Sequence, residues 1–219
     1  CGGGRCADHR QPGPLRELFQ EFGILDEIDW VPIDALYRVS FPDNSGVTLP
    51  LSRAEIEQTL IAKFPDEQAA ILEYFDIVYK FAAEMQSFYE SMSKGGGAEP
   101  GTLKKLMVKA LFSKKYPMLA KYGLKTAQEV HEALFKSVEL QLCLNAYWCF
   151  MGMPPERFPF SVLARCTYIY VEDKPFFLKG GSQMISQALA EVIERKGGEV
   201  RYNCGVEEII IEKNKAVGV

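Results

Sequence analysis

The sequence predicts an α+β fold, in which a helical domain that carries a small sheet is followed by a short α/β segment. Three features support this prediction: an alternating hairpin pattern near the start, about a hundred residues of helical periodicity, and a glycine-bounded helix that leads into short strands. We expect the first domain to occupy residues 1–178 and the α/β segment residues 179–219. A chain of 219 residues with 47% hydrophobic content can bury a substantial core.

The first expected elements are a short helix and a β-hairpin. Apolar residues at helical spacing in "LRELFQEFGI" predict a helix that Gly23 ends. A hairpin is predicted over about residues 35–50, because Tyr37, Val39, Val47 and Leu49 alternate with polar neighbours and "DNSG" supplies a turn.

A helical region is predicted over about residues 52–150. Ser52 with Glu55 and Thr126 with Glu129 stand at capping-box spacing, which marks two helix starts. Between them, apolar residues recur at steps of four and three and predict a long amphipathic helix. Such a stripe is either a core-facing seam or the lining of a lipophilic ligand site. Its members are Ile71, Phe75, Val78, Ala82, Met85, Tyr89 and Met92.

One helix is predicted from Thr126 to about Phe150, and its second half, "LQLCLNAYWCFMGM", is apolar nearly all round. We expect that half to be enclosed. The following "SVLARCTYIYVED" fits a strand by its β-branched and aromatic content and a helix by its flanks.

The last part of the chain places two glycine pairs around a helix. Gly180 and Gly181 precede Ser182, which is expected to cap the helix, and Gly197 and Gly198 are expected to end it. Short strands are predicted at "EVRYN", "VEEIIIE" and "KAVGV", the last two joined by a turn at "KNK".

A lysine-rich stretch lies between Pro100 and Gln128, which contains no acidic residue. Interleaved apolar residues give it the composition of a basic amphipathic segment, and an anionic bilayer surface is one partner that would suit it. A solvated helix face is the other interpretation. The lysines proposed for peripheral membrane contact are Lys104, Lys105, Lys109, Lys114 and Lys115.

Composition restricts the remaining classes. A net charge of −4 argues against a nucleic-acid partner. The six cysteines lack paired spacing and are expected to be reduced thiols, no metal site is predicted, and His131 is expected at the surface rather than in acid–base catalysis. The sequence has neither a membrane-spanning run nor a signal peptide, so a cytoplasmic protein, peripherally membrane-associated if the lysines bind lipid, is expected.

The run "KGGSQMISQALAEVIERKGGEVRYNCGVEEIIIEKNKAVGV" resembles the flavin-dependent oxidoreductases of the phytoene desaturase, carotenoid isomerase and retinol saturase type. "GPLRELFQEFGI", "FPDE" and "MGMPPERFPFS" are also similar to that family. The chain begins at Cys1 and stops within a predicted strand, which favours an internal fragment of such a protein.

The resemblance implies that residues 1–178 form a substrate (cap) domain and that residues 179–219 are part of an FAD-binding α/β domain. It implies that the main chain of Val206 lies against the adenine of FAD and that Gly180 and Gly181 enter the domain-crossing helix. The expected cofactor is therefore FAD in the full-length parent. Because the phosphate-binding G-x-G-x-x-G turn is absent, we expect the chain alone not to retain FAD.

The implied activity is the desaturation, saturation or isomerisation of an apolar polyene-like substrate. Catalytic residues are not assigned, because in flavin enzymes the cofactor does the redox chemistry. An alternative is a non-catalytic helical module that binds a lipid surface or a protein partner through the lysine stretch.

Overall fold

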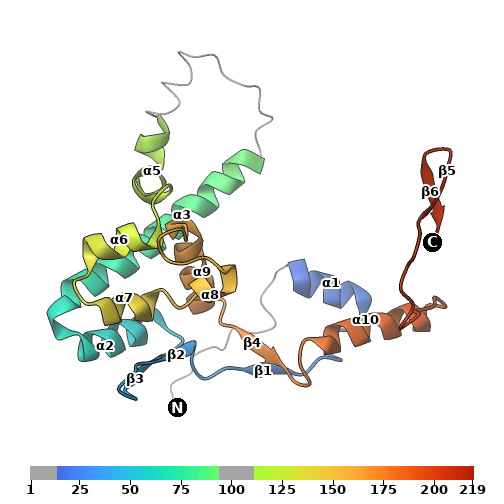
Figure 1. Ribbon diagram of the computed structural model, residues 1–219, viewed down its shortest axis with the longest axis horizontal. Coiled ribbons are helices and arrows are strands. Elements are labelled where there is room, and N and C mark those ends of the chain that lie inside the picture. The colour runs from blue at the N-terminus through green and yellow to red at the C-terminus, as the bar shows by residue number, and fades with distance from the viewer. Residues whose placement is uncertain (1–13, 94–110) are drawn as a thin grey trace. The chain divides into compact units, whose positions relative to one another are not determined.

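The computed structural model describes residues 14–93 and 111–219, and these fall into two compact units (Figure 1). The helical unit is Pro32–Pro175, and the terminal unit comprises residues 14–31 together with Phe176–Val219. Residues 14–31 group with the end of the chain because Phe19 and Ile24 share a hydrophobic cluster with Ala188. The division at residue 178 into a substrate domain and an FAD-domain segment stays a prediction.

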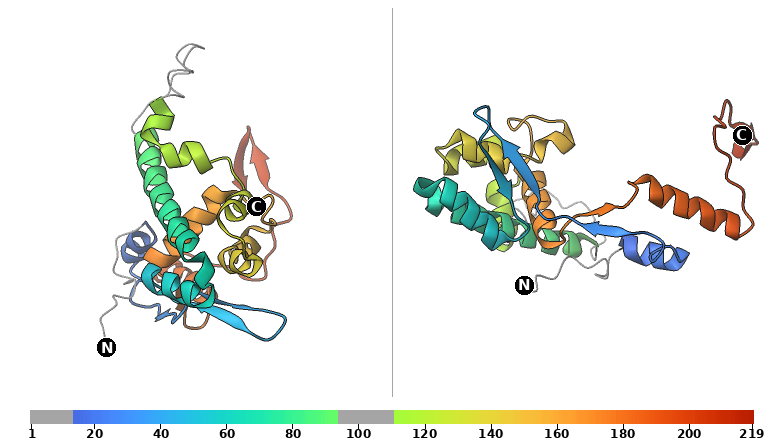
Figure 2. Two further views of the ribbon diagram at one scale, coloured as in Figure 1. Left: turned by 90° about the vertical axis from the view of Figure 1, so that its left-hand side faces the viewer. Right: turned by 90° about the horizontal axis from the view of Figure 1, so that it is seen from below.

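The helical unit is organised around one long helix. In the part of the chain that the structure describes, α3 (Gln68–Ser93) packs against α2 (Arg53–Lys63), α5 (Pro117–Tyr122) and α9 (Phe160–Glu172), as Figures 1 and 2 show. The other helices are η1 (Pro65–Glu67), α6 (Ala127–Leu134), α7 (Val138–Leu144) and α8 (Trp148–Met151). The long amphipathic helix predicted from the apolar stripe is confirmed.

The apolar stripe of α3 serves two environments. Ile71, Phe75, Val78 and Ala82 are buried in the core of the unit, so this half is the core seam that its spacing indicates. Beyond Ala82 the stripe emerges. Met85 is half-buried, and Tyr89 and Met92 are exposed.

Helix caps follow the predicted spacing. The Thr126 side chain accepts the Glu129 N–H and the Glu129 carboxylate accepts the Thr126 N–H, so this capping box is complete. Ser52 accepts the Glu55 N–H, and its hydroxyl donates to the Glu55 carboxylate. Both helix starts are therefore confirmed.

The single helix predicted from Thr126 to Phe150 is wrong, because the chain breaks it into α6, α7 and α8. Phe135 is extended at φ −118 and ψ 139, and Ser137 begins α7 by accepting the Leu140 N–H. Glu67 Oε1 accepts the N–H groups of Lys136 and Ser137, at 2.7 and 2.8 Å. The Glu67 carboxylate thus provides the acceptors that backbone carbonyls would provide in a continuous helix. Because Glu67 is distant in sequence, local periodicity could not predict this contact.

The expected enclosure of "LQLCLNAYWCFMGM" holds for only one face. Leu140, Cys143, Leu144 and Tyr147 are buried. The opposite face is exposed, which corrects the prediction, because short helices separated by turns present one side to solvent. That face consists of Leu142, Trp148, Phe150 and Met151.

The ambiguous segment after Pro159 is a helix. Residues Phe160, Leu163, Ala164, Thr167 and Val171 of α9 are buried, which is the period of a helix and not of a strand. The preceding prolines fix where it starts, with Pro159 as the N-cap residue.

The predicted hairpin is present. Strand β2 (Tyr37–Ser40) pairs antiparallel with β3 (Gly46–Leu49), with Tyr37 opposite Leu49 and Val39 opposite Val47. Asn44 in its turn takes a positive φ of 63°. The hairpin lies beside α2 and buries Val47 and Leu49.

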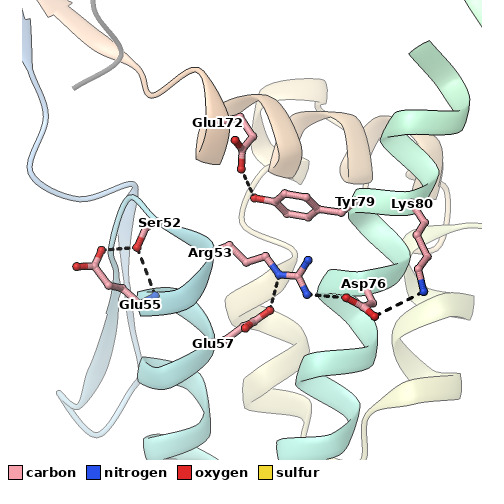
Figure 3. A network of polar contacts seen from close by, with 8 residues as sticks. All are labelled: Ser52, Arg53, Glu55, Glu57, Asp76, Tyr79, Lys80 and Glu172. Carbon is pink, nitrogen blue, oxygen red and sulfur yellow. Dashed lines mark hydrogen bonds and ion pairs between the residues drawn. The ribbon is translucent and has the colours of Figure 1, made fainter. Parts of the chain in front are cut away.

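A polar network links three helices of the helical unit (Figure 3). Arg53 of α2 binds Glu57 at 2.6 Å and Asp76 of α3 at 2.7 Å. Its guanidinium lies 4.7 Å from the centroid of Tyr79, whose hydroxyl donates to Glu172 of α9. Burial is the largest cause of the raised pKa of Tyr79, followed by the neighbouring Glu172 carboxylate, so the phenol stays protonated and donates.

The terminal unit packs α1 (Pro14–Phe22) against α10 (Gln183–Arg195), and β1 (Trp30–Pro32) pairs with β4 (Phe176–Leu178). The helix predicted before Gly23 is thus confirmed, and Gly23 takes a φ of 73°. Arg195 donates to Glu27 at 2.7 and 3.2 Å across the two segments.

The end of the chain forms a hairpin of β5 (Ile210–Glu212) and β6 (Lys215–Gly218). Lys213 and Asn214 both have positive φ, as a two-residue turn of type I′ requires, so the turn predicted at "KNK" is confirmed. The strand predicted at "EVRYN" is wrong, and "VEEIIIE" is a strand only at its end. Apart from the half-buried Val200, those residues are exposed, and they have no partner strand in the described chain, so no ladder stabilises a strand there.

Within residues 14–93 and 111–219, no helix combines the length and the apolar character that crossing a bilayer requires.

Candidate functional site

An apolar groove of about 430 Å³ lies where the apolar stripe of α3 leaves the core. Helices α3 and α5 and the helical residues 111–115 contribute most of it. Because Met85 and Tyr89 belong to the stripe, the lipophilic lining and the core seam are successive parts of one helix face. The described side chains around the groove are Phe81, Met85, Phe88, Tyr89, Phe112, Ser113, Leu119, Ala120, Gly123, Leu124 and Ser161.

Aromatic rings in and beside the groove hold one another edge to face. The Phe88 ring lies 5.6 Å from Phe112 at 89° and 5.6 Å from Tyr116 at 81°. Tyr89 is tilted against Phe88 at 6.1 Å. Such perpendicular contacts stabilise ring orientation beyond the burial of area alone.

Basic side chains surround this aromatic region. The ammonium of Lys115 lies 5.0 Å from the Tyr116 centroid, and those of Lys121 and Lys125 lie 4.8 and 5.8 Å from the Tyr122 centroid. Lys114 is exposed. Lys104, Lys105 and Lys109, which the sequence assigns to the same surface, lie outside the described residues.

A second groove, of about 480 Å³, runs between α3 and α9. It brings together Arg165 and Asp173, which no spacing in the sequence connects to a role, with Glu90 of α3. Ala82 and Ala83 also line it, and their small side chains leave the space open.

His131 is buried at 0% exposure, so its expected place at the surface is wrong. Its ring packs 5.2 Å from Tyr74 and 5.8 Å from Phe135, and neither ring nitrogen has a hydrogen-bond partner in the described chain. Burial lowers the pKa of His131 to about 4, which keeps the imidazole neutral. His131 follows the buried Ala127 by four residues and so shares its helix face, which is the sequence signal that would have predicted its burial.

The predicted cofactor residues lie at the two ends of α10. Gly180 and Gly181 have φ of 88° and 86°, and the Gly181 N–H donates to Leu178 O at 2.8 Å. Ser182 is helical and makes no capping bond with its side chain, so its expected role as the cap is wrong. The left-handed turn at the glycines starts the helix instead, and Gly197, at φ 83°, ends it as predicted.

Val206 follows α10 in an extended segment that belongs to no strand, and its side chain is 61% exposed. The structure therefore leaves Gly180 and Gly181 at one end of the helix and Val206 after the other. It does not bring these three residues into one cluster.

The described residues offer little support for metal or thiol chemistry. They contain no group of three or more candidate ligands for a metal ion. Cys143, Cys149, Cys166 and Cys204 are free thiols. Burial raises the pKa of Cys143 to about 11, which makes it a poor nucleophile.

The described residues thus comprise a helical unit with an apolar groove and a terminal unit with a glycine-flanked helix. Residues 2–219 match the family described as flavin containing amine oxidoreductase, and the chain belongs to that family.

The chain is also similar to curated desaturases and to a curated reductase. The chain is 27% identical over 218 residues to a phytoene desaturase (neurosporene-forming) of Cereibacter sphaeroides, covering 95% of this chain and 38% of that protein. It is 27% identical over 212 residues to an all-trans-retinol 13,14-reductase of Rattus norvegicus, covering 90% and 33%. A 4,4'-diapophytoene desaturase (4,4'-diapolycopene-forming) of Methylomonas sp. is 23% identical over 209 residues, covering 94% and 39%. The chain thus spans less than two fifths of the length of these relatives.

Proposed function

We propose that this chain supplies the substrate (cap) domain and part of the FAD-binding domain of an oxidoreductase that acts on an apolar polyene-like substrate. The observation that carries the proposal is the family match over residues 2–219, with desaturases and a retinol reductase among the relatives. The reaction class is desaturation, saturation or isomerisation of a conjugated chain.

FAD is the cofactor of this proposal, and its hydride chemistry belongs to the isoalloxazine ring. Val206 is proposed to lie against the adenine. An exposed side chain and a main chain outside any strand are consistent with that role, because the backbone groups are not committed to a described ladder.

The glycine pair is proposed to let the chain approach the cofactor closely where the domains cross. A Cβ at residue 181 would meet no atom within 4 Å, so space is available beside the backbone there. Since the chain has no G-x-G-x-x-G turn, FAD is proposed to bind the parent protein and not these 219 residues alone.

We also propose that the lysine-rich face contacts an anionic membrane surface, from which an apolar reactant would be drawn. Lys114 and Lys115 are exposed beside the exposed Leu111, and Leu124 lies close to Lys125 in sequence. This pairing of basic and apolar side chains suits the interface of a bilayer.

Flavin binding distinguishes the proposed oxidoreductase from a non-catalytic helical module. The open reading frame that contains this chain should carry a dinucleotide fingerprint upstream of Cys1, and its full product should purify yellow. A colourless full product that takes up no added FAD would instead support the helical module.

The membrane contact is tested separately, by sedimentation with vesicles of phosphatidylserine and phosphatidylcholine. A variant with Lys104, Lys105 and Lys109 changed to Glu should remain in the supernatant while the original chain sediments. The control is a double variant with Lys63→Glu and Lys136→Glu, because these two lysines line a separate groove beside Pro65. Equal sedimentation of all three proteins would remove the proposed contact.

A further inference from the structure

We propose that the apolar groove between α3 and α5 is the seat of a conjugated hydrocarbon chain. This inference rests on the proposed function, which it deepens by assigning the substrate class to one groove. The lining, the volume and the surroundings of this groove all favour an uncharged, apolar ligand.

The lining defines a neutral ligand. Every described side chain on the groove is uncharged, and the ammonium groups of Lys115 and Lys121 lie over the rings of Tyr116 and Tyr122. An ionic head would have no counter-charge among the described lining residues, whereas a hydrocarbon would need none. The volume of about 430 Å³ is in the range of small-molecule sites.

The walls favour a planar, polarisable chain over a saturated one. Phe88, Tyr89 and Phe112 contribute aromatic surface to the lining, and Met85 adds a thioether. The edge-to-face contacts of Phe88 with Phe112 and Tyr116 hold the rings in fixed orientations. A rigid polyene presents flat faces to such rings and loses little conformational freedom on binding, unlike a saturated chain of equal length.

The second groove does not suit the same ligand. Arg165, Asp173 and Glu90 line it, and burying these groups under a hydrocarbon would leave them without water. The two grooves therefore provide a matched comparison, because each has an exposed alanine on its wall. These are Ala120 for the apolar groove and Ala83 for the groove with Arg165.

The experiment is a fluorescence titration of the 219-residue chain with all-trans-retinol, without flavin. Ala120→Phe places a ring in the apolar groove and should weaken retinol binding by about tenfold or more, whereas Ala83→Phe should leave it within about twofold. Phenylalanine is chosen because it adds volume without an indole that would change the fluorescence.

A second variant covers the case in which Ala120→Phe does not fold, as judged by circular dichroism. Leu124 lines the groove with a fully exposed side chain, so Leu124→Asp brings a charge to the groove without disturbing the core. It should also weaken retinol binding about tenfold. Unchanged binding in the folded groove variants, or an equal loss in Ala83→Phe, would overturn the assignment.

Competition with hexadecanol separates a conjugated ligand from any lipid tail. Most of the bound retinol should remain bound when hexadecanol is added at the same concentration. If hexadecanol displaces half of the bound retinol under these conditions, the preference for a conjugated chain is overturned. Because these titrations use no cofactor, their failure leaves the flavin measurement on the full-length product intact. A colourless full-length product would in turn count against the proposed function and not against the groove.

Discussion

The guanidinium of Arg53 lies 4.7 Å from the ring centroid of Tyr79 while it binds carboxylates on both sides. Arg53 therefore joins α2 to α3, and Tyr79 extends the link to Glu172 of α9. Only a planar guanidinium can stack on a ring and bind two carboxylates at its edges.

Replacing Arg53 with Ala should lower the free energy of unfolding by about 1–2 kcal/mol, because Glu57 and Tyr79 lose a partner where the network is partly buried. Urea denaturation measures the change. Lys80→Ala is the control, since Lys80 makes one exposed contact with Asp76 at 3.6 Å and should cost about 0.5 kcal/mol or less. Equal losses in both variants would show that stacking on Tyr79 contributes nothing.

His131 should make stability depend on pH. Its pKa is about 4 in the folded chain, against 6.5 for an unperturbed histidine, so the unfolded state binds a proton that the folded state refuses. Stability is fully present above pH 6.5 and falls as the pH drops toward 4. Between about pH 7 and pH 5 the loss should be about 2 kcal/mol.

Urea midpoints of the original chain and of His131→Phe check this dependence. The phenyl ring fills the site between Tyr74 and Phe135 without titrating, and other groups contribute equally to both proteins. The difference in stability between the two should therefore shift with pH across this interval. A difference that stays constant would mean that His131 is protonated as readily in the fold as in water.

The glycine pair should resist substitution for reasons of backbone conformation. Gly180→Ala and Gly181→Ala should each cost about 1 kcal/mol, because both residues have positive φ near 90°. Gly205→Ala is the control, since a Cβ there meets no atom within 4 Å and its φ is not in that region. Thermal unfolding compares the three, and a neutral Gly181→Ala would contradict the turn.

Glu67 should control the break between α6 and α7. Glu67→Ala leaves the N–H groups of Lys136 and Ser137 without their acceptor, at an expected cost of about 1–3 kcal/mol, whereas Glu67→Gln keeps a carbonyl oxygen there and should cost less. Hydrogen exchange of these two amides gives a local readout. Unchanged protection in Glu67→Ala would show that the carboxylate does not hold the break.

Local patterns predicted the elements whose signals are themselves local. The α3 stripe, the Thr126 capping box, the hairpin turn and the turn at "KNK" all depend on residues within a few positions of one another. The family resemblance was likewise contained in short motifs, and it is confirmed by the match over residues 2–219.

Features set by distant residues could not be predicted. The break at Phe135 depends on Glu67, and the burial of His131 depends on Tyr74. The sequence predicted a lipophilic lining only as an alternative to a core seam, because the apolar spacing of α3 does not show at which residue the core ends. The segment around Val206 lacks a partner strand among the described residues, so strand propensity alone misled at "EVRYN".

The measurement that tests the central claim most directly is anaerobic flavin reduction in the purified product of the full open reading frame. We expect this product to carry FAD. The more saturated counterpart of a polyene should bleach the absorbance of the oxidised flavin, or the polyene should restore that absorbance when it is added to the reduced flavin. A product that binds no FAD, or whose flavin responds to amines and never to polyenes, would contradict the account.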